Sequence, residues 1–143
     1  LQWNDLVTDM HFMLQKEVVD RMAATPGSRT YGRLSVMTQF RAEVRPLFDV
    51  PPESFSPVPK VRSSIVRLQP LPEPPVDAGS FDKLTKVVTA AFSMRRKTLR
   101  NSLRRVLTEE QISGAGIDPG QRAEQLSLSQ FAALARSLPN DAN

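Results

Sequence analysis

The sequence predicts the remnant of an α/β sheet followed by a small all-α domain. Alternating strand patterns come before residue 70, helical spacing dominates after residue 80, and a proline-rich stretch lies between them. That stretch, QPLPEPPVDAG, holds four prolines in eleven residues, and proline fits neither a helix interior nor a central strand. We therefore divide the chain into residues 1–70, a linker at 71–79 and residues 80–143.

The first unit mixes strand and helix signals. In chain order we expect a buried strand over Leu6–Gln15, a helix over about Glu17–Ala24, a short helix over Gly32–Thr38, and half-buried strands over Phe40–Val50 and Val61–Leu68. The sequence Thr25-Pro26-Gly27-Ser28 ends the first helix by ordinary proline and glycine chemistry. So few strands leave the sheet short of partners, which indicates the last part of a larger sheet.

The second unit is predicted to be helical throughout. We expect helices that begin after a Ser80 cap, that cover Thr98–Leu107, that run from Thr108 to Gly114, and that cover Ser127–Leu138. Thr108 and Gln111 have the spacing of a capping box, in which each residue satisfies a backbone amide of the other.

Composition excludes several classes of site. The chain has no cysteine and one histidine, His11, so disulfides, thiolate metal sites and histidine clusters are excluded. No apolar run approaches the ~20 residues that cross a bilayer, and the first residues lack the pattern of a signal peptide. We expect a soluble, cytoplasmic protein that needs no metal. Because it begins at Leu1, we expect that this is not a native translation start.

Basic residues are concentrated in one stretch of the second unit. On a helix, Arg96, Arg100 and Arg104 would share one face, because they lie four residues apart. Their mutual repulsion is explained if an anionic polymer such as RNA binds there. The alternative is a basic face that is only solvated. The stretch contains no acid and carries Lys83, Lys86, Arg95, Arg96, Lys97, Arg100, Arg104 and Arg105.

An aromatic residue stands in a second candidate segment, Phe55-Ser56-Pro57-Val58-Pro59-Lys60-Val61. The alternate prolines stiffen the backbone, so Phe55 could be presented with little loss of entropy on binding. A ring held in this way can stack on a base, which contributes ~1–3 kcal/mol. The alternative is that Phe55 fills a gap in the core.

Several stretches, taken in order, resemble one family. They are Asp9–Arg21, Tyr31–Val36, Phe55–Val61, Arg95–Leu103, Gly116–Pro119 and Arg122–Glu124. Their order and spacing resemble the small-subunit ribosomal RNA adenine dimethyltransferases of the KsgA type along nearly the whole chain. Arg62 departs from the acidic residue that the family pattern has at that position.

The resemblance implies a doubly wound methyltransferase domain that uses S-adenosylmethionine, followed by a small helical RNA-binding domain. Such enzymes dimethylate two adjacent adenines near the 3′ end of small-subunit ribosomal RNA, and the target base must leave its stack. The resemblance assigns stacking on the target adenine to Phe55. It assigns RNA contacts to Arg95, Arg96 and Lys97 and makes Arg21 and Arg122 further candidates, while the helix-face argument adds Arg100, Arg104 and Arg105.

The family's glycine-rich cofactor loop, acidic ribose-binding residue and Asn-Leu-Pro-Tyr motif are not found in the sequence. We therefore expect that these residues alone bind no S-adenosylmethionine and transfer no methyl group. An incomplete sheet also exposes an edge, which predicts self-association. Two other functions stay open: a non-catalytic RNA- or ribosome-binding assembly module, and a large-subunit adenine methyltransferase of the antibiotic-resistance type.

Overall fold

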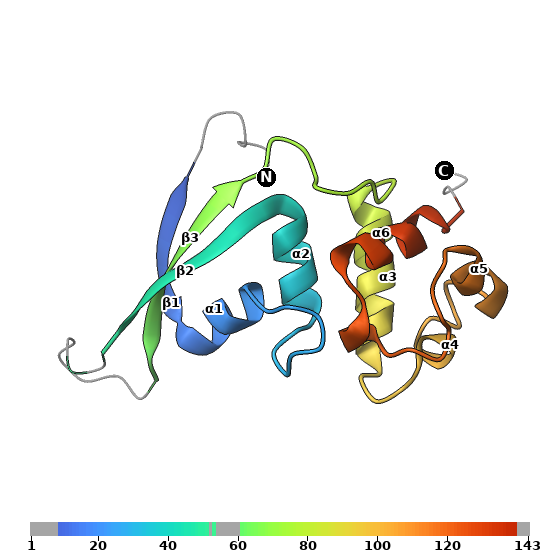
Figure 1. Ribbon diagram of the computed structural model, residues 1–143, viewed down its shortest axis with the longest axis horizontal. Helices are drawn as coiled ribbons and strands as arrows, with labels where there is room; N and C mark the ends of the chain where they lie inside the picture. The colour runs from blue at the N-terminus through green and yellow to red at the C-terminus, as the bar shows by residue number, and fades with distance from the viewer. Residues whose placement is uncertain (1–8, 52, 54–60, 140–143) are drawn as a thin grey trace. The chain divides into compact units, whose positions relative to one another are not determined.

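The computed structural model describes residues 9–51, 53 and 61–139 (Figure 1). These residues form two compact units. The sheet unit comprises the described residues up to Ala24 and the described part of Leu34–Pro75. The helical unit comprises Thr25–Arg33 and the described residues from Val76 onward.

The segment Thr25–Arg33 belongs to the helical unit, whereas the division made from the sequence placed it in the first unit. Its aromatic side chain, Tyr31, is buried in the helical unit, and the Tyr31 hydroxyl donates to the Leu126 carbonyl at 2.6 Å. The Gly27 amide donates to the Glu124 carbonyl at 2.7 Å. These bonds join residues far apart in the sequence, which local pattern does not reveal.

The expected linker at 71–79 is also shorter than predicted. The first unit extends to Pro75, and the second begins at Val76. Ala78 is buried, and the Arg136 guanidinium donates to the Asp77 carbonyl. Gly79 has φ +82°, a left-handed conformation that glycine adopts without strain. Residues 76–79, the end of the predicted linker, therefore belong to the folded helical unit.

Three antiparallel strands form the sheet, in the spatial order β1-β3-β2. They are β1 (Met10–Gln15), β2 (Ala42–Val50) and β3 (Ser63–Pro70). In the register, Phe12 of β1 and Pro46 of β2 both lie opposite Val66 of the central strand. A β-bulge follows Pro46, and this proline is tolerated because β2 lies at an edge of the sheet.

Two helices accompany the strands, α1 (Lys16–Met22) and α2 (Arg33–Arg41). α1 follows β1 directly and contacts all three strands. The Gln39 side-chain amide donates to the Met22 and Ala24 carbonyls, at 2.9 Å each. α2 thereby satisfies carbonyls at the end of α1 that have no partner within that helix.

The two faces of the sheet differ in burial at the central strand, where Val66 is buried and Ile65 is half-buried, although Phe12 on the Val66 face is 42% exposed. Val66 is fully buried, whereas Met13, Ile65 and Phe48 stand opposite one another on the other face, with Met13 52% and Phe48 61% exposed. The prediction that Leu6–Gln15 forms a buried strand is therefore wrong for β1. It is an edge strand, and no described element of the sheet unit covers its outer face.

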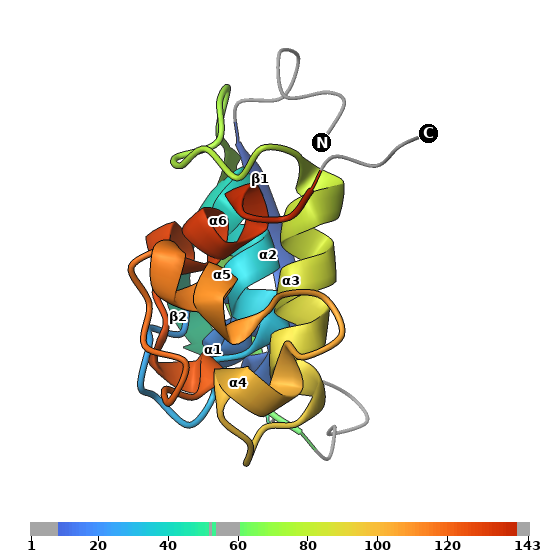
Figure 2. The same cartoon turned by 90° about the vertical axis from the view of Figure 1, so that its right-hand side faces the viewer.

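The helical unit is built on two helices that lie side by side, α3 (Phe81–Ser93) and α6 (Leu128–Arg136) (Figures 1 and 2). Its other elements are α4 (Leu99–Ser102), α5 (Glu109–Gly114) and the 3₁₀ helix η2 (Ala123–Gln125). The rings of Tyr31, Phe92 and Phe131 pack in sequence, with centroids 6.1 and 5.6 Å apart. The fully buried side chains include Leu84, Val87, Val88, Leu99, Leu103, Ile112, Leu126 and Leu134.

Side-chain caps set the starts of three helices. Ser80 accepts a hydrogen bond from the Lys83 amide at the start of α3, and Ser127 and Gln130 form a capping box at the start of α6. The predicted capping box of Thr108 and Gln111 is confirmed. None of the helices in the described ranges has the length and apolarity that a membrane span requires.

Candidate nucleic-acid interface

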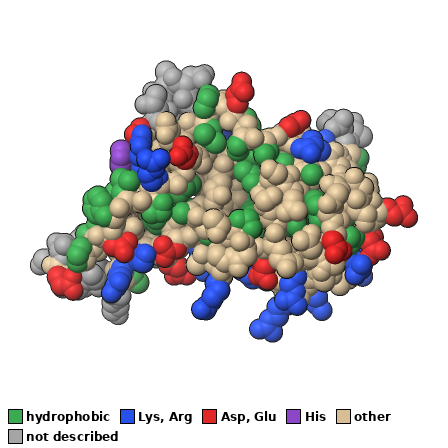
Figure 3. All heavy atoms as spheres, viewed as in Figure 1, with side chains coloured by type: hydrophobic (Ala, Val, Ile, Leu, Met, Phe, Trp, Pro, Cys, Tyr) green, Lys and Arg blue, Asp and Glu red, His purple; other side chains and the backbone are tan. Residues whose placement is uncertain are grey.

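The turn between α3 and α4 carries exposed basic residues of the predicted site. α3 ends at Ser93, and the Lys97 amide closes the turn by donating to the Met94 carbonyl at 2.9 Å. Arg96 and Lys97 are both exposed. Lysine and arginine side chains project here from the lower edge of the helical unit (Figure 3). Within the part of the chain that the structure describes, no acidic side chain pairs with either residue.

Buried leucines and backbone hydrogen bonds fix the far end of this turn. Leu99 is fully buried, and its amide donates to the Gln121 carbonyl at 2.8 Å. The Arg100 amide donates to the Pro119 carbonyl at 2.9 Å. These amides would otherwise lack partners at the start of α4. Because exposed Arg122 follows Gln121, the structure brings a second basic segment beside the turn.

Arg95 has a different environment from its neighbours. Its guanidinium donates to the Tyr31 carbonyl at 2.7 Å and to the Arg29 carbonyl at 3.2 Å. It also lies 3.7 Å from the Glu124 carboxylate. Arg95 therefore joins the turn to segment 25–33 and to η2. The sequence did not indicate this structural role, because Arg95 stands there among other basic residues.

The predicted helix over Thr98–Leu107 is wrong beyond its first turn. Residues 94–97 and 103–106 form turns, so Arg96, Arg100 and Arg104 do not lie on one helix. The chain leaves the helical path because Leu103 ends α4 and the Thr108 capping box begins α5 soon afterwards. Arg100 pairs with Glu109. Arg104 and Arg105 are exposed.

Arg21 belongs to the sheet unit, whereas the other described candidates belong to the helical unit. It is exposed on α1 and forms an ion pair with Glu17, four residues earlier, at 2.9 Å. Such exposed pairs contribute little stability, so the Arg21 side chain can exchange this partner for another anion.

Phe55 lies outside the described residues, as do Pro57 and Pro59. Near this segment, Val50 pairs with Ser63 across the hairpin, and the Lys16 amide donates to the Arg62 carbonyl at 2.8 Å. A hollow of about 330 Å³ adjoins these residues. It is lined by Gln15, Lys16, Glu17, Asp20, Val61 and Arg62. Glu17 and Asp20 thus bring acidic groups to the hollow that Arg62 also lines.

Two shifted titrations have structural causes. Burial raises the pKa of Tyr31 to about 12. The pKa of Asp9 is lowered, chiefly by the hydrogen bond from the Arg67 guanidinium at 2.9 Å. Among the described residues, no group of three histidine or acidic side chains could hold a metal ion. Neither shifted group stands in the basic turn, whose residues are suited to binding anions through permanent charge.

A second basic feature was not anticipated as a site. A hollow of about 460 Å³ in the helical unit is lined by Lys83 and Lys86 of α3, by Arg105, and by residues near the end of α6. The spacing of the two lysines, three residues apart on one helix, was the available signal. The lysine spacing could not predict that residues beyond α6 also line the hollow.

The chain is similar to one family along nearly its whole length. The family model described as ribosomal RNA adenine dimethylase matches residues 2–139. The ribosomal RNA small subunit methyltransferase A of Legionella pneumophila (strain Corby) is 51% identical over 140 residues, which are 98% of this chain and 55% of that protein. The protein of the same name from Methylococcus capsulatus is 55% identical over 134 residues, 94% of this chain and 52% of that protein. The chain therefore spans about half the length of these relatives.

Two solved structures have a similar fold. A dimethyladenosine transferase from Plasmodium falciparum superposes with a TM-score of 0.70 at 24% identity, covering 90% of this chain and 56% of that chain. The 23S rRNA methyltransferase ErmE superposes with a TM-score of 0.67, also at 24% identity, covering 92% and 55%. At this identity the likeness concerns the fold, and it agrees with the expected part of a methyltransferase fold.

Proposed function

The chain belongs to the ribosomal RNA adenine dimethylase family, and we propose that it is the RNA-holding part of an enzyme that dimethylates two adjacent adenines of small-subunit ribosomal RNA. In this proposal its three strands end a doubly wound methyltransferase sheet, and the helical unit is the RNA-binding domain. The enzyme acts on the small ribosomal subunit in the cytoplasm.

The turn between α3 and α4 is the observation that supports RNA binding. Arg96 and Lys97 project from a turn whose backbone is fixed at both ends, and Arg122 follows a segment bonded to the start of α4. A fixed backbone places these charges without a large loss of entropy on binding. Charges of this kind set the affinity and register of an RNA backbone without reading its sequence.

The roles of the eight predicted RNA-binding residues then separate. Arg95 and Arg100 have partners inside the helical unit, so we assign them chiefly to holding the interface in shape. Arg21 is assigned to a contact from the sheet unit. Direct phosphate contacts fall to the remaining five residues, which are Arg96, Lys97, Arg104, Arg105 and Arg122.

Recognition of the target base is assigned to Phe55. In this proposal its ring stacks on the extruded adenine. The support is the family resemblance together with the described ends of the hairpin, because paired Val50 and Ser63 hold both ends of the intervening segment at one end of the sheet.

S-adenosylmethionine supplies the methyl group in the family's reaction. The described residues do not provide the glycine-rich loop and acidic ribose-binding residue that the resemblance assigns to the cofactor. No step of methyl transfer is therefore assigned to them.

Salt-dependent binding tests the role of the turn. The probe is a fluorescent hairpin RNA with the 3′-terminal sequence of small-subunit ribosomal RNA, and the affinity of the 143-residue chain is measured by anisotropy between 50 and 200 mM salt. Each phosphate contact contributes about 0.7–0.9 to the slope of log affinity against log salt. That slope is negative, and replacing Arg96 and Lys97 by glutamine should make it shallower by about 1.5.

A matched control carries the same loss of two charges elsewhere. Arg29→Gln with Arg33→Gln removes two exposed cations of segment 25–33 and should change the slope by less than half as much. Equal slopes for the turn variant and the unmodified chain would remove the turn from the interface.

The large-subunit alternative is less well supported. The relatives near 50% identity bear small-subunit names, whereas the likeness to ErmE at 24% identity concerns the fold. A non-catalytic assembly module would use the same basic turn, so RNA binding alone does not separate it from the enzyme. Methyl transfer by the whole gene product that contains this chain would separate them.

We also propose that the chain by itself self-associates through the exposed face of the sheet. Met13, Ile65 and Phe48 form an apolar row across all three strands. A second copy offers the same row, so two faces can cover each other about a twofold axis. Burying this row removes apolar area from water, which favours association.

A further inference from the structure

The hollow beside α3 combines cations with an apolar wall. It has a volume of about 460 Å³ and is lined by Gly79, Ser80, Asp82, Lys83, Lys86, Arg105, Val106, Leu138 and Pro139. All of these residues belong to the helical unit. Three cations and one acid give the lining a formal charge of +2, from +3 and −1.

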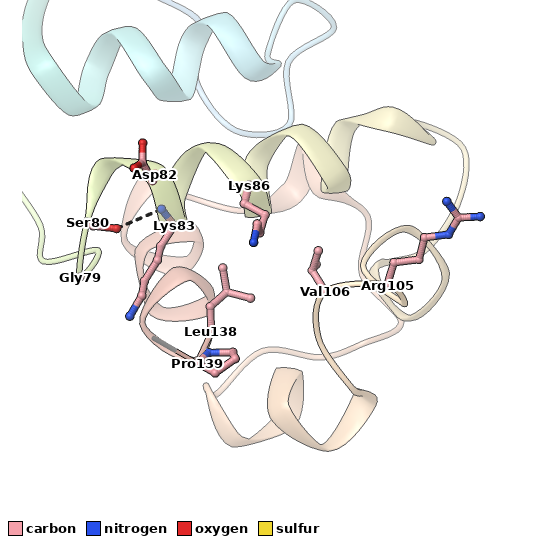
Figure 4. Close-up of a pocket in the computed structure, with 9 residues that line it drawn as sticks. All are labelled: Gly79, Ser80, Asp82, Lys83, Lys86, Arg105, Val106, Leu138 and Pro139. Atoms are coloured by element: carbon pink, nitrogen blue, oxygen red, sulfur yellow. Dashed lines mark hydrogen bonds between the residues drawn. The ribbon is translucent and has the colours of Figure 1, made fainter. Parts of the chain in front are cut away.

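Lys86 points into the hollow, Lys83 lies along its edge, and the acid points away. In Figure 4 the Lys86 side chain descends from α3 toward Val106, and the Lys83 side chain descends at the edge of the hollow near Gly79. Asp82 points to the opposite side of α3 (Figure 4). The local charge that a ligand meets is therefore more positive than the sum suggests.

Lys86 is not neutralised within the fold. Asp82 precedes it by four residues, the spacing at which a helical ion pair forms. No ion pair joins the two residues in the described part of the chain, and Lys86 is exposed. Lys83 and Lys86 lie on the same side of α3 (Figure 4), so one anion bound on that side can meet both charges.

The shape of the hollow favours a polymer backbone over a small, enclosed ligand. Its lining includes exposed residues from α3, from the turn after α4 and from the chain end after α6. It has no aromatic side chain on which a base could stack. Charge and a small apolar wall suit a phosphate and its sugar, which carry no sequence information.

We propose that Lys83 and Lys86 hold a backbone phosphate of the bound RNA in this hollow, as a second contact separate from the α3–α4 turn. The proposal rests on the proposed function, because the RNA that the turn binds is the polymer whose backbone enters the hollow. Arg105 stands at the rim, where its guanidinium points away from the centre (Figure 4).

A pair of double variants tests this contact with the hairpin RNA probe. Lys83→Gln with Lys86→Gln should lower the salt slope by about 1.5 and weaken binding on the order of ten-fold at 0.1 M salt. Arg96→Gln with Lys97→Gln, measured beside it, reports on the turn alone. A lower slope for the turn variant with an unchanged slope for the lysine variant overturns the second contact and leaves the proposed function standing. Unchanged slopes for both overturn both.

A photo-cross-link separates contact from long-range attraction. The chain has no cysteine, so Pro139→Cys places a single thiol-reactive photoprobe at the hollow while both lysines remain. Ser129→Cys, exposed on α6 and outside the lining, is the matched control. We expect the RNA to cross-link at position 139 several times more than at 129, and equal yields at both positions overturn the contact.

Discussion

Replacing Arg95 by alanine should destabilise the helical unit, whereas replacing Arg96 should not. The Arg95 guanidinium makes two hydrogen bonds to backbone carbonyls, at 2.7 and 3.2 Å, and lies 3.7 Å from Glu124. A hydrogen bond from a charged group contributes about 1.5–3 kcal/mol when well buried. The Arg95 side chain is 46% exposed, so the shorter bond is assigned about 1 kcal/mol and the rest together about 0.5 kcal/mol.

The expected loss is therefore about 1–2 kcal/mol, which corresponds to a fall in Tm of roughly 4–16 °C for a unit of this size. Urea unfolding followed by circular dichroism measures the free energy of unfolding. Arg96→Ala, exposed and without an acidic partner in the described ranges, should change the free energy by less than about 0.5 kcal/mol.

Arg95→Lys keeps the charge and loses the forked geometry, so its stability should fall between the two. RNA binding separates the roles further, because Arg96→Ala should lower the salt slope although stability is unchanged. Equal unfolding free energies for Arg95→Ala and the unmodified chain would refute the structural role of Arg95. A loss of stability with Arg96→Ala as large as that with Arg95→Ala would refute the separation.

Three further predictions concern other parts of the chain. Thr108→Ala should lower the free energy of unfolding in urea by about 1 kcal/mol because it breaks the capping box of α5, while Thr108→Ser should lower it little. Equal free energies of unfolding for Thr108→Ala and the unmodified chain would exclude the cap. Burial raises the pKa of Tyr31 to about 12 from 10.0, so its contribution to stability is complete below pH 10 and is lost as the pH rises through 12. Between pH 10 and pH 12 the free energy of unfolding should therefore fall less steeply for Tyr31→Phe than for the unmodified chain. An equally steep fall for both would contradict this prediction. Met13→Ser with Phe48→Ser should lower the self-association constant measured by sedimentation, whereas Leu34→Ser, also exposed, should not; a monomer before any substitution would refute self-association.

Local signals predicted those elements that are decided locally. The capping box at Thr108 was visible as a spacing of two residue types, and it forms. α3 was visible from Ser80 and the three-four spacing of its apolar residues, and Ser80 accepts the expected hydrogen bond. In these cases the side chains that specify the element lie within one turn of it.

The interface was harder to predict because distant contacts shape it. Four-residue spacing suggested a continuous helix for Arg96, Arg100 and Arg104, but amides at the start of α4 bond to carbonyls of Pro119 and Gln121. Arg95 resembled its basic neighbours in sequence, and its partners belong to segment 25–33. The basic residues could thus be found from the sequence, whereas their separate roles depend on contacts across the helical unit.

The exposed sheet face shows a different limit. The apolar residues of Leu6–Gln15 suggested burial, because apolar side chains are usually covered. In the sheet unit β1 is an edge strand, and Met13 and Phe48 are exposed on either side of half-buried Ile65. Apolarity predicted the strand but could not say whether another surface covers it.

Mapping the RNA nucleotides beside the turn tests the central claim most directly. Ser93→Cys, a small change at the exposed end of α3, places one photoprobe next to Arg96 in a chain without other cysteines. After irradiation with purified small and large ribosomal subunits, reverse transcription locates the cross-linked nucleotides. We predict cross-links in the 3′ part of small-subunit ribosomal RNA that disappear with Arg96→Gln and Lys97→Gln. Cross-links only in large-subunit RNA, or none in either, would contradict the account.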